Sequence, residues 1–183
     1  MYFRERIAPL SIIVALDEDG GFAKDGKIPW INEPWAKEDL KHFQEVTKGG
    51  VCIMGRNTYE DMLEIMKGRG KKEKGIKEIL PGRQSYVVTR NNAYKAIGAK
   101  VVHGIRDAVN DLDQTDRREV FVIGGEKLFI EALAWTTTVY CTIINGDWNC
   151  DRFFPIKTLI DNYKIVEGSK NEHMKFVKYT RIR

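Results

Sequence analysis

Continuous apolar runs rich in valine and isoleucine alternate with amphipathic stretches along this chain. Strands without polar interruption are typical of a parallel sheet that is buried on both faces, so we expect an α/β fold with a mainly parallel central sheet and flanking helices. The expected strands are residues 10–16, 50–55, 85–89, 99–103, 119–125 and 139–144. The expected helices are residues 37–47, 105–112, 126–133 and one that begins at Tyr59, with Asn57 or Thr58 as its N-cap.

Two further apolar runs, residues 163–168 and 174–183, are candidates for an antiparallel hairpin at the sheet edge. In open sheets of this type, ligands bind beyond the carboxyl ends of the strands, where turns meet the first residues of helices. This rule directs the search for a functional site to residues 16–30, 55–58, 89–90 and 124–128.

The length of 183 residues suits one domain, and we expect a single domain over residues 1–183 that is monomeric and cytoplasmic. No apolar run is long enough for a secretory signal or a membrane span, so we expect no membrane partner. Cys52, Cys141 and Cys150 lie far apart and match no metal-ligand spacing. We therefore expect neither a bound metal nor a disulfide framework.

The net charge of +4 raises the question of a nucleic-acid partner. Residues 67–78, KGRGKKEKGIKE, hold six Lys or Arg and two Glu and account for the whole excess, so the rest of the chain is balanced. A short run rich in Lys and Gly is most often a solvated loop. We therefore expect no nucleic-acid partner, and a contact with nucleic acid or an anionic ligand is the less favoured alternative.

Asp39 lies beside the apolar stripe formed by Leu40, Phe43 and Val46 on the expected helix 37–47. Taken alone, it is an ordinary acid in a first helical turn, favoured there by the helix dipole. The neighbouring residues suggest a functional role for Asp39, because the large aromatic Trp30 precedes the helix and Pro29 restricts the backbone before it.

Two strand-to-helix turns carry the features of anion sites. The run IMGRNTY at 53–59 combines exposed backbone N–H groups with a guanidinium, and the run VIGGEKL at 122–128 has glycines that permit close approach of a ligand. Each turn taken singly is more simply a tight connection between a strand and a helix. The turn LPGR at 80–83 is usually a surface feature.

The order of these motifs is more specific than any one of them. A strand is followed by Pro-Trp, a helical Asp-Leu-x-x-Phe, MGR-x-T, LPGR, VIGG, a strand with Thr142 and finally Asp151-x-Phe-Phe-Pro. In this order the chain resembles the dihydrofolate reductase family from about Leu10 to the C-terminus. The resemblance implies a three-layer fold with a mixed, mainly parallel eight-stranded sheet. It also implies NADPH-dependent reduction of 7,8-dihydrofolate to 5,6,7,8-tetrahydrofolate, by hydride transfer to C6 and protonation at N5, for one-carbon metabolism.

The same resemblance implies roles for the residues around the substrate. Asp39 matches the acid that holds the pterin and supports protonation, Trp30 matches the residue that orders a water, and Thr142 matches a hydroxyl bonded to the acid. Arg83 matches the arginine that binds the glutamate carboxylate of the substrate. The matches to the apolar substrate pocket are Ile13, Leu40, Phe43, Met62, Leu80 and Ile123.

On the cofactor side, the resemblance places Ala15 and Ile123 at the nicotinamide, and residues 20–27 match a mobile loop that closes over it. From this loop and its end we expect contacts by Gly21, Phe22, Ala23, Lys27 and Ile28. At the phosphates and the adenosine we expect Gly55, Arg56, Asn57, Thr58, Thr89, Arg90 and His103, with Arg90 suited to a 2′-phosphate. The remaining matches are Gly124 and Gly125, joined by a cis bond in the family, and the following Glu126, Lys127, Leu128 and Phe129.

Four departures from the family pattern bear on this assignment. Phe129 stands where many members have tyrosine, and Ala23 replaces a glycine, which leads us to expect altered loop closure because alanine avoids positive φ. About four extra residues, up to Trp35, lie between Trp30 and Asp39 and are expected at the pocket mouth. The fourth departure is a basic insertion that spans residues 63–79. We favour a tolerated surface insertion, and attraction of polyglutamylated folate is the alternative. Apart from these four, residues 1–9 form an N-terminal extension.

Two other functions compete with this assignment. The pyrimidine reductases of riboflavin synthesis are related in structure and use NADPH, but they lack the pairing of Pro-Trp with a helical Asp-Leu-x-x-Phe. A binding module that retained the fold without turnover, contacting RNA through residues 67–77, belongs to a different class. The set of Asp39, Trp30, Thr142 and Arg83 argues against that module.

Overall fold

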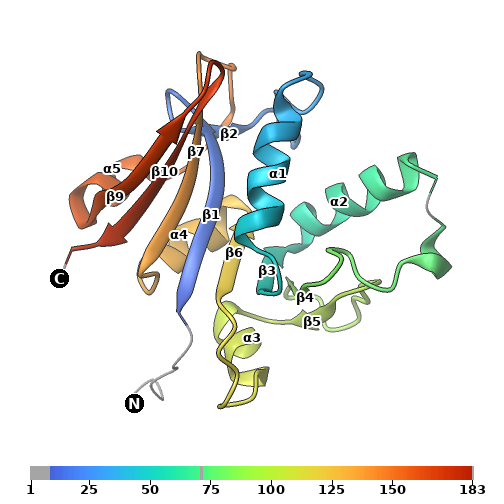
Figure 1. Cartoon of the computed structure of the whole chain (residues 1–183). Coiled ribbons are helices and arrows are strands. Elements are labelled where there is room, and N and C mark those ends of the chain that lie inside the picture. The colour runs from blue at the N-terminus through green and yellow to red at the C-terminus, as the bar shows by residue number, and fades with distance from the viewer. Residues whose placement is uncertain (1–8, 71, 183) are drawn as a thin grey trace.

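The computed structural model describes residues 9–70 and 72–182, so residues 1–8 of the expected N-terminal extension lie outside the described part (Figure 1). The strands are β1 Leu10–Asp17, β2 Gly21–Ala23, β3 Val51–Gly55, β4 Gln84–Val88, β5 Lys100–Val102, β6 Val120–Gly124, β7 Thr138–Ile144, β8 Arg152–Phe153, β9 Tyr163–Lys170 and β10 Met174–Arg181. The helices are α1 Ala36–Val46, α2 Arg56–Gly68, α3 Ile105–Asp111, α4 Glu126–Leu133 and α5 Ile156–Asn162, with a short 3-10 helix, η1, at Glu73–Gly75.

Eight of the strands form one sheet in the order β5-β4-β3-β6-β1-β7-β10-β9. The pairs from β5 across to β7 are parallel, whereas β10 pairs antiparallel with both β7 and β9. The prediction of a mixed, mainly parallel eight-stranded sheet with an antiparallel C-terminal hairpin at its edge is therefore confirmed.

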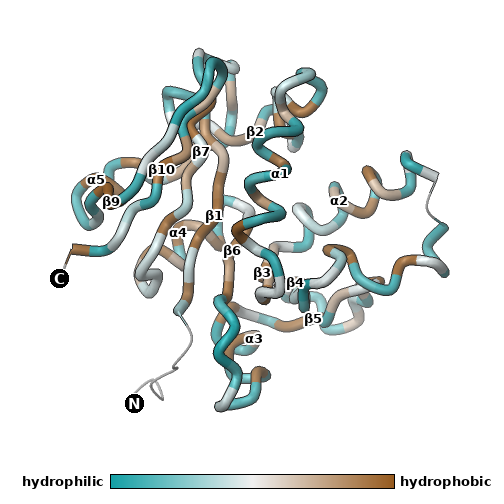
Figure 2. Tube along the Cα trace, in the orientation of Figure 1, coloured by the Kyte–Doolittle hydropathy of each residue, from teal (hydrophilic) through white to brown (hydrophobic). Residues whose placement is uncertain are grey.

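Helices cover both faces of this sheet, as Figure 1 shows. Side chains alternate along β1, so Ile12, Val14 and Leu16 face a core that also contains side chains of α3, α4 and α5. Ile13 faces the other way, into a second core that includes residues of α1 and α2. The apolar colouring of the central strands in Figure 2 agrees with burial on both sides. This arrangement gives the three layers that were expected.

Helix α2 differs from the prediction at both ends. It begins at Arg56 rather than Tyr59, because Gly55 is extended and serves as the N-cap, and this places Asn57 and Thr58 inside the first turn. It continues to Gly68, so the expected insertion 63–79 starts within a helix rather than a loop. The residues before Gly68 are good helix formers, and the helix stops where two glycines occur close together.

Four short elements were not predicted: β2, β8, α5 and η1. β2 and β8 pair antiparallel in a small separate sheet, and α5 packs Leu159 into the core behind the main sheet. Two- and three-residue strands have no periodicity of their own, so they become visible only when their partner is in place. Within the described residues, none of the helices has the length and hydropathy of a membrane span.

Candidate active site

The carboxyl ends of β1, β3, β4 and β6 lie at one edge of the sheet, because these strands run parallel. They end at Asp17, Gly55, Val88 and Gly124, so the regions singled out in the sequence converge at that edge. Helix α1 crosses the face of the sheet beside this edge (Figure 1). The candidate site is therefore formed by the strand ends, α1 and the start of α2.

Asp39 lies in the first turn of α1 and is partly buried. Burial raises the pKa of its carboxyl above the ordinary value, and a hydrogen bond from the side chain of Thr142 acts in the opposite direction. Thr142 is buried on β7 and is paired in register with Ala15 of β1, so these two residues lie side by side under the helix. The structure thus brings together Asp39, Thr142 and Ala15, which the sequence places far apart.

Trp30 is fully buried next to this group. Its ring packs edge-on against Trp148, with 5.9 Å between the ring centres, and it shares a small core with Ala15. The indole Nε1 is buried and has no acceptor among the described residues. A buried N–H donor of this kind normally has a protein, ligand or water partner, so this atom points to an acceptor other than the described chain.

Most of the expected apolar pocket residues share one core on the α1 side of the sheet. That core includes Ile13, Phe43, Met62, Leu80 and Ile123. Leu40 is outside this cluster, and 44% of its surface is exposed. Its position next to Asp39 on α1 leaves an apolar side chain open to solvent beside the acid.

Arg83 is held in place by the C-terminal end of α1. Its Nη1 donates to Oγ1 of Thr47 at 3.1 Å, its Nε and Nη2 donate to the carbonyl of Pro81, and its guanidinium lies 5.8 Å from the ring centre of Phe43. Thr47 was not singled out in the sequence. The only sequence feature that marks it is its place at the end of a helix. The hydroxyl of Thr47 in turn donates to the Phe43 carbonyl at 2.7 Å.

The two glycine-containing turns lie against each other. The bond between Gly124 and Gly125 is cis, and a Cβ placed on Gly124 would lie 3.3 Å from Oγ1 of Thr58. A Cβ on Gly55 would lie 3.5 Å from the backbone nitrogen of Gly125. The first turns of α2 and α4 therefore start next to each other, with Leu128 buried and Lys127 exposed in the turn of α4.

The remaining cofactor-side residues lie in these turns and at the ends of β4 and β5. Nδ1 of His103 lies 2.9 Å from the carbonyl oxygen of Thr89, and Arg90 is exposed next to them. Arg56 pairs with Glu60 at 3.6 Å. Asn57 is exposed, and Glu126 pairs with Arg152 of β8 at 3.7 Å.

The segment 20–27 is attached to β8. Gly21 and Ala23 pair with β8, the Ala23 carbonyl accepts the backbone N–H of Asp151 at 2.9 Å, and the Asp151 carboxylate accepts the N–H of Asp25 at 3.0 Å. Positive φ occurs at Asp25 and Gly26, in the turn, and not at Ala23. Ala23 therefore lies in strand β2 without positive φ, and altered loop closure stays a prediction.

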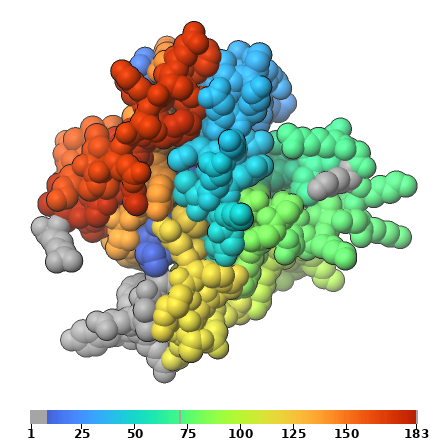
Figure 3. Space-filling view, in the orientation of Figure 1, coloured from blue at the N-terminus to red at the C-terminus, as the bar shows by residue number. Residues whose placement is uncertain are grey.

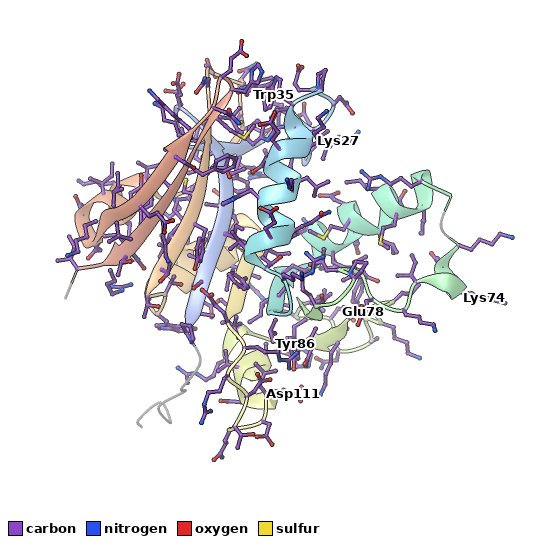
Figure 4. All side chains as sticks on the ribbon, viewed as in Figure 1. Lys27, Trp35, Lys74, Glu78, Tyr86 and Asp111 are labelled. Carbon is purple, nitrogen blue, oxygen red and sulfur yellow. The ribbon has the colours of Figure 1, made fainter. Side chains whose placement is uncertain are left out.

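Aromatic packing joins this segment to α4. Phe22 meets the buried ring of Phe129 edge-on, with 5.5 Å between the ring centres, and Phe154 contacts the same ring from another side at 5.4 Å. Lys27 and Ile28 are exposed at the end of the segment, near the start of α1 (Figure 4). Among residues 9–70 and 72–182, no three His, Cys, Asp or Glu side chains are grouped so that they could hold a metal ion.

The comparisons with known proteins agree with this architecture. A sequence model of the dihydrofolate reductase family matches residues 9–181. The dihydrofolate reductase type 3 of Salmonella typhimurium is 36% identical over 146 residues, which cover 80% of this chain and 78% of that protein. The dihydrofolate reductase of Staphylococcus aureus strain MSSA476 is 32% identical over 152 residues, 83% of this chain and 81% of that one.

Among solved structures, dihydrofolate reductase from Enterococcus faecalis, complexed with NADP(H) and RAB-propyl, superimposes with a TM-score of 0.74. It is 28% identical, and the match covers 99% of this chain and 99% of the other. Because the family match spans nearly the whole chain and agrees with both the relatives and the fold, this chain belongs to the dihydrofolate reductase family.

Proposed function

We propose that this chain reduces 7,8-dihydrofolate to 5,6,7,8-tetrahydrofolate, with NADPH as the hydride donor and Asp39 as the group that binds and activates the pterin. Proteins of its family are oxidoreductases, and this chain is one of them. The observation that carries the finer proposal is the partly buried Asp39 carboxylate, bonded by Thr142 at the edge of an apolar core.

Asp39 binds the pterin through two N–H groups, the exocyclic amine and the neighbouring ring nitrogen. A carboxylate that accepts two parallel N–H donors fixes the orientation of a planar ring as well as binding it. Thr142 donates to the same carboxylate and so restricts its rotation. The buried N–H of Trp30 is suited to hold a water beside the acid, which gives a proton a route to N5.

The apolar core and Arg83 hold the rest of the substrate. Phe43, Leu40 and their neighbours present apolar surface to the pterin and aminobenzoyl rings. The guanidinium of Arg83 uses three of its N–H groups on Thr47 and Pro81. Because arginine has five such groups, two remain for the glutamate carboxylate of the substrate.

The cofactor residues fit NADPH at the two adjoining turns. Bound NADPH supplies the hydride that C6 of the pterin accepts. Gly124 leaves a space next to Thr58 that any side chain would fill, so the backbone is open to a closely bound group. The first turns of α2 and α4 offer backbone N–H groups to phosphates, and the exposed Arg90 offers a cation to a 2′-phosphate.

The segment 20–27 closes the nicotinamide side. Its attachment to β8 and the edge-on contact of Phe22 with the buried ring of Phe129 support this role. Hydride transfer requires the two reacting carbons in contact and shielded from water, so this packing contributes by positioning and by excluding solvent.

The test follows the absorbance of NADPH after addition of dihydrofolate to the wild-type protein and to Asp39→Asn. The substitution is expected to lower kcat at neutral pH by about 100-fold or more, since general acid–base assistance contributes that much. NADPH binding remains, and the loss shrinks at low pH, where solvent protonates N5. Lys37→Gln is the control, because Lys37 is exposed on the same turn. Equal behaviour of the two variants would remove Asp39 from the mechanism.

A further inference from the structure

The start of helix α1 has no capping side chain, and the same holds for α2, α3, α4 and α5. The N-cap residue of α1 is Trp35, whose side chain makes no capping hydrogen bond within the described chain. The backbone continues from a turn in which the N–H of Ala36 donates to the carbonyl of Glu33 at 3.0 Å. The N–H of Glu38 donates to the Trp35 carbonyl at 2.9 Å, so the first turn depends on backbone bonds and on the packing of its side chains. Asp39 lies within this first turn, so contacts with other elements are needed to fix its position.

The ring of Trp35 is held by two other rings. It stacks on the imidazole of His173, with 5.2 Å between ring centres and 12° between planes. It meets Trp148 edge-on at 5.8 Å, and Trp148 in turn contacts Trp30. Figure 4 shows Trp35 at the N-terminal end of α1, beside the tip of the β9–β10 hairpin. Trp35, one of the extra residues before Asp39, packs against this hairpin tip and shares a small core with Trp30 and Ala15.

Hydrogen bonds fasten the hairpin tip on both sides. Asn171 donates from Nδ2 to Oε2 of Glu38 at 2.6 Å, which joins the tip to the first turn of α1. Asn145, just after β7, donates from Nδ2 to the Glu172 carbonyl at 2.8 Å, and its N–H donates to the carbonyl of His173 at 2.9 Å. In Figure 3 the red hairpin tip lies directly against the blue segment that leads into α1. The tip therefore connects the end of β7, which carries Thr142, to the turn that carries Asp39.

We infer that Trp35 is a positioning residue for Asp39: clamped between His173 and Trp148, it replaces the missing side-chain cap and holds the first turn of α1 over Thr142. This inference rests on the role proposed above for Asp39. The distance between the acid and its partners depends on where α1 starts relative to β7. A displacement of about 1 Å at a reacting group can cost about 100-fold in rate, so a loosened stack affects catalysis without touching the substrate.

The direct test is a carbon-13 NMR titration of the Asp39 carboxyl in wild type, Trp35→Ala and Trp35→Phe. Burial raises the pKa of Asp39 more strongly than the Thr142 bond lowers it. Loosening the turn admits solvent, so in Trp35→Ala the pKa falls toward the ordinary value of an aspartate, and Trp35→Phe retains most of the wild-type value. This readout does not depend on turnover, so it separates failure of this inference from failure of the proposed function.

The kinetic test compares Michaelis constants in the same variants. Trp35→Ala is expected to raise KM for dihydrofolate about tenfold and to lower kcat, with KM for NADPH changed less than about twofold, because the stack adjoins the acid and not the cofactor turns. His173→Ala removes the other half of the stack without altering α1. It is expected to give the same result, so it tests the inference even if Trp35→Ala does not fold.

Trp135→Ala is the matched control. Trp135 is a partly buried tryptophan just after α4, packed against the core on the opposite face of the sheet. Its loss is expected to reduce stability while leaving the Asp39 pKa and both Michaelis constants unchanged. The inference is overturned if folded Trp35→Ala and His173→Ala retain the wild-type Asp39 pKa and KM. It is also overturned if Trp135→Ala shifts them equally.

Discussion

The carboxylate of Asp39 is acted on by two neighbouring features that move its pKa in opposite directions. Burial of the side chain raises the pKa of Asp39, and the hydrogen bond from Thr142 lowers it. Burial is the larger effect, so the acid keeps its proton to a higher pH than a solvated aspartate does. A raised pKa brings the acid closer to the pH at which a group can both bind and release a proton.

Thr142→Val separates these two effects, because it removes the hydroxyl with little change of shape. Without the bond that favours the charged form, the pKa of Asp39 rises further, and the pH profile of kcat/KM for dihydrofolate moves to higher pH. We expect kcat/KM at neutral pH to fall about tenfold, the scale of one hydrogen bond to a charged group. Thr138→Val, at the other end of β7, should leave the profile in place. A Thr142→Val profile that coincides with wild type contradicts the role of the bond.

At the scale of elements, the segment 20–27 depends on β8 for its position. Asp151 contributes two of the contacts, its N–H to the Ala23 carbonyl and its carboxylate to the Asp25 N–H. Asp151→Ala removes the second contact and keeps the first. We expect KM for NADPH to rise about threefold to tenfold, in line with the loss of one ordinary hydrogen bond, and faster amide hydrogen exchange at residues 21–27.

The control for this prediction is Asp113→Ala. Asp113 makes a similar local bond, to the N–H of Thr115 at 2.7 Å, in the connection between α3 and β6. It lies far from the segment, so exchange at residues 21–27 and KM for NADPH should not change. If Asp151→Ala leaves both quantities at their wild-type values, the attachment to β8 does not govern the segment.

The basic insertion is also an element-scale matter. Part of its charge is paired locally, since Nζ of Lys67 lies 2.7 Å from Glu73 and 3.5 Å from Glu64. Lys74 extends away from α1 in Figure 4. These contacts support the favoured interpretation of a surface insertion, because they stabilise the connection itself and do not require a ligand.

At the scale of the whole molecule, the ionised Asp39 should lower the free energy of unfolding at neutral pH. Its folded-state pKa is raised, so between the unfolded value, about 3.9, and the folded value the native state binds more protons than the unfolded state. Stability therefore decreases as pH rises through this interval and stays lower above it. Asp39→Asn should be more stable than wild type at neutral pH, and the advantage should vanish below about pH 4.

Thermal unfolding of both proteins from pH 3 to pH 8 measures this difference. Lys37→Gln, at an exposed position of the same turn, serves as the control and should show no comparable gain. An Asp39→Asn variant that is less stable than wild type at pH 7 would show that the buried charge is not a net cost. The expected combination is a stabilised protein with little activity, which a general loss of structure cannot produce.

The accuracy of the predictions also varied with scale. Helix α4 was expected at residues 126–133 and is found there, and the edge hairpin β9–β10 was expected from its two apolar runs. These elements have strong periodicity or clear punctuation by glycine. By contrast, β2, β8 and α5 were missed, and the start of α2 was misplaced by three residues because Gly55 rather than a polar side chain is its cap.

The sequence by itself determined which stretches become the main strands and helices, that the sheet is mainly parallel, and, through the order of its motifs, the family. These properties are local or follow from motif order, so they can be read along the chain. Tertiary structure alone decided that Thr47 anchors Arg83 and that Trp35 packs against the hairpin tip. It also brings Thr142, which the family resemblance matched to the acid, beside Asp39. Such contacts join residues on different elements, and they depend on strand order and helix placement, which no local pattern encodes.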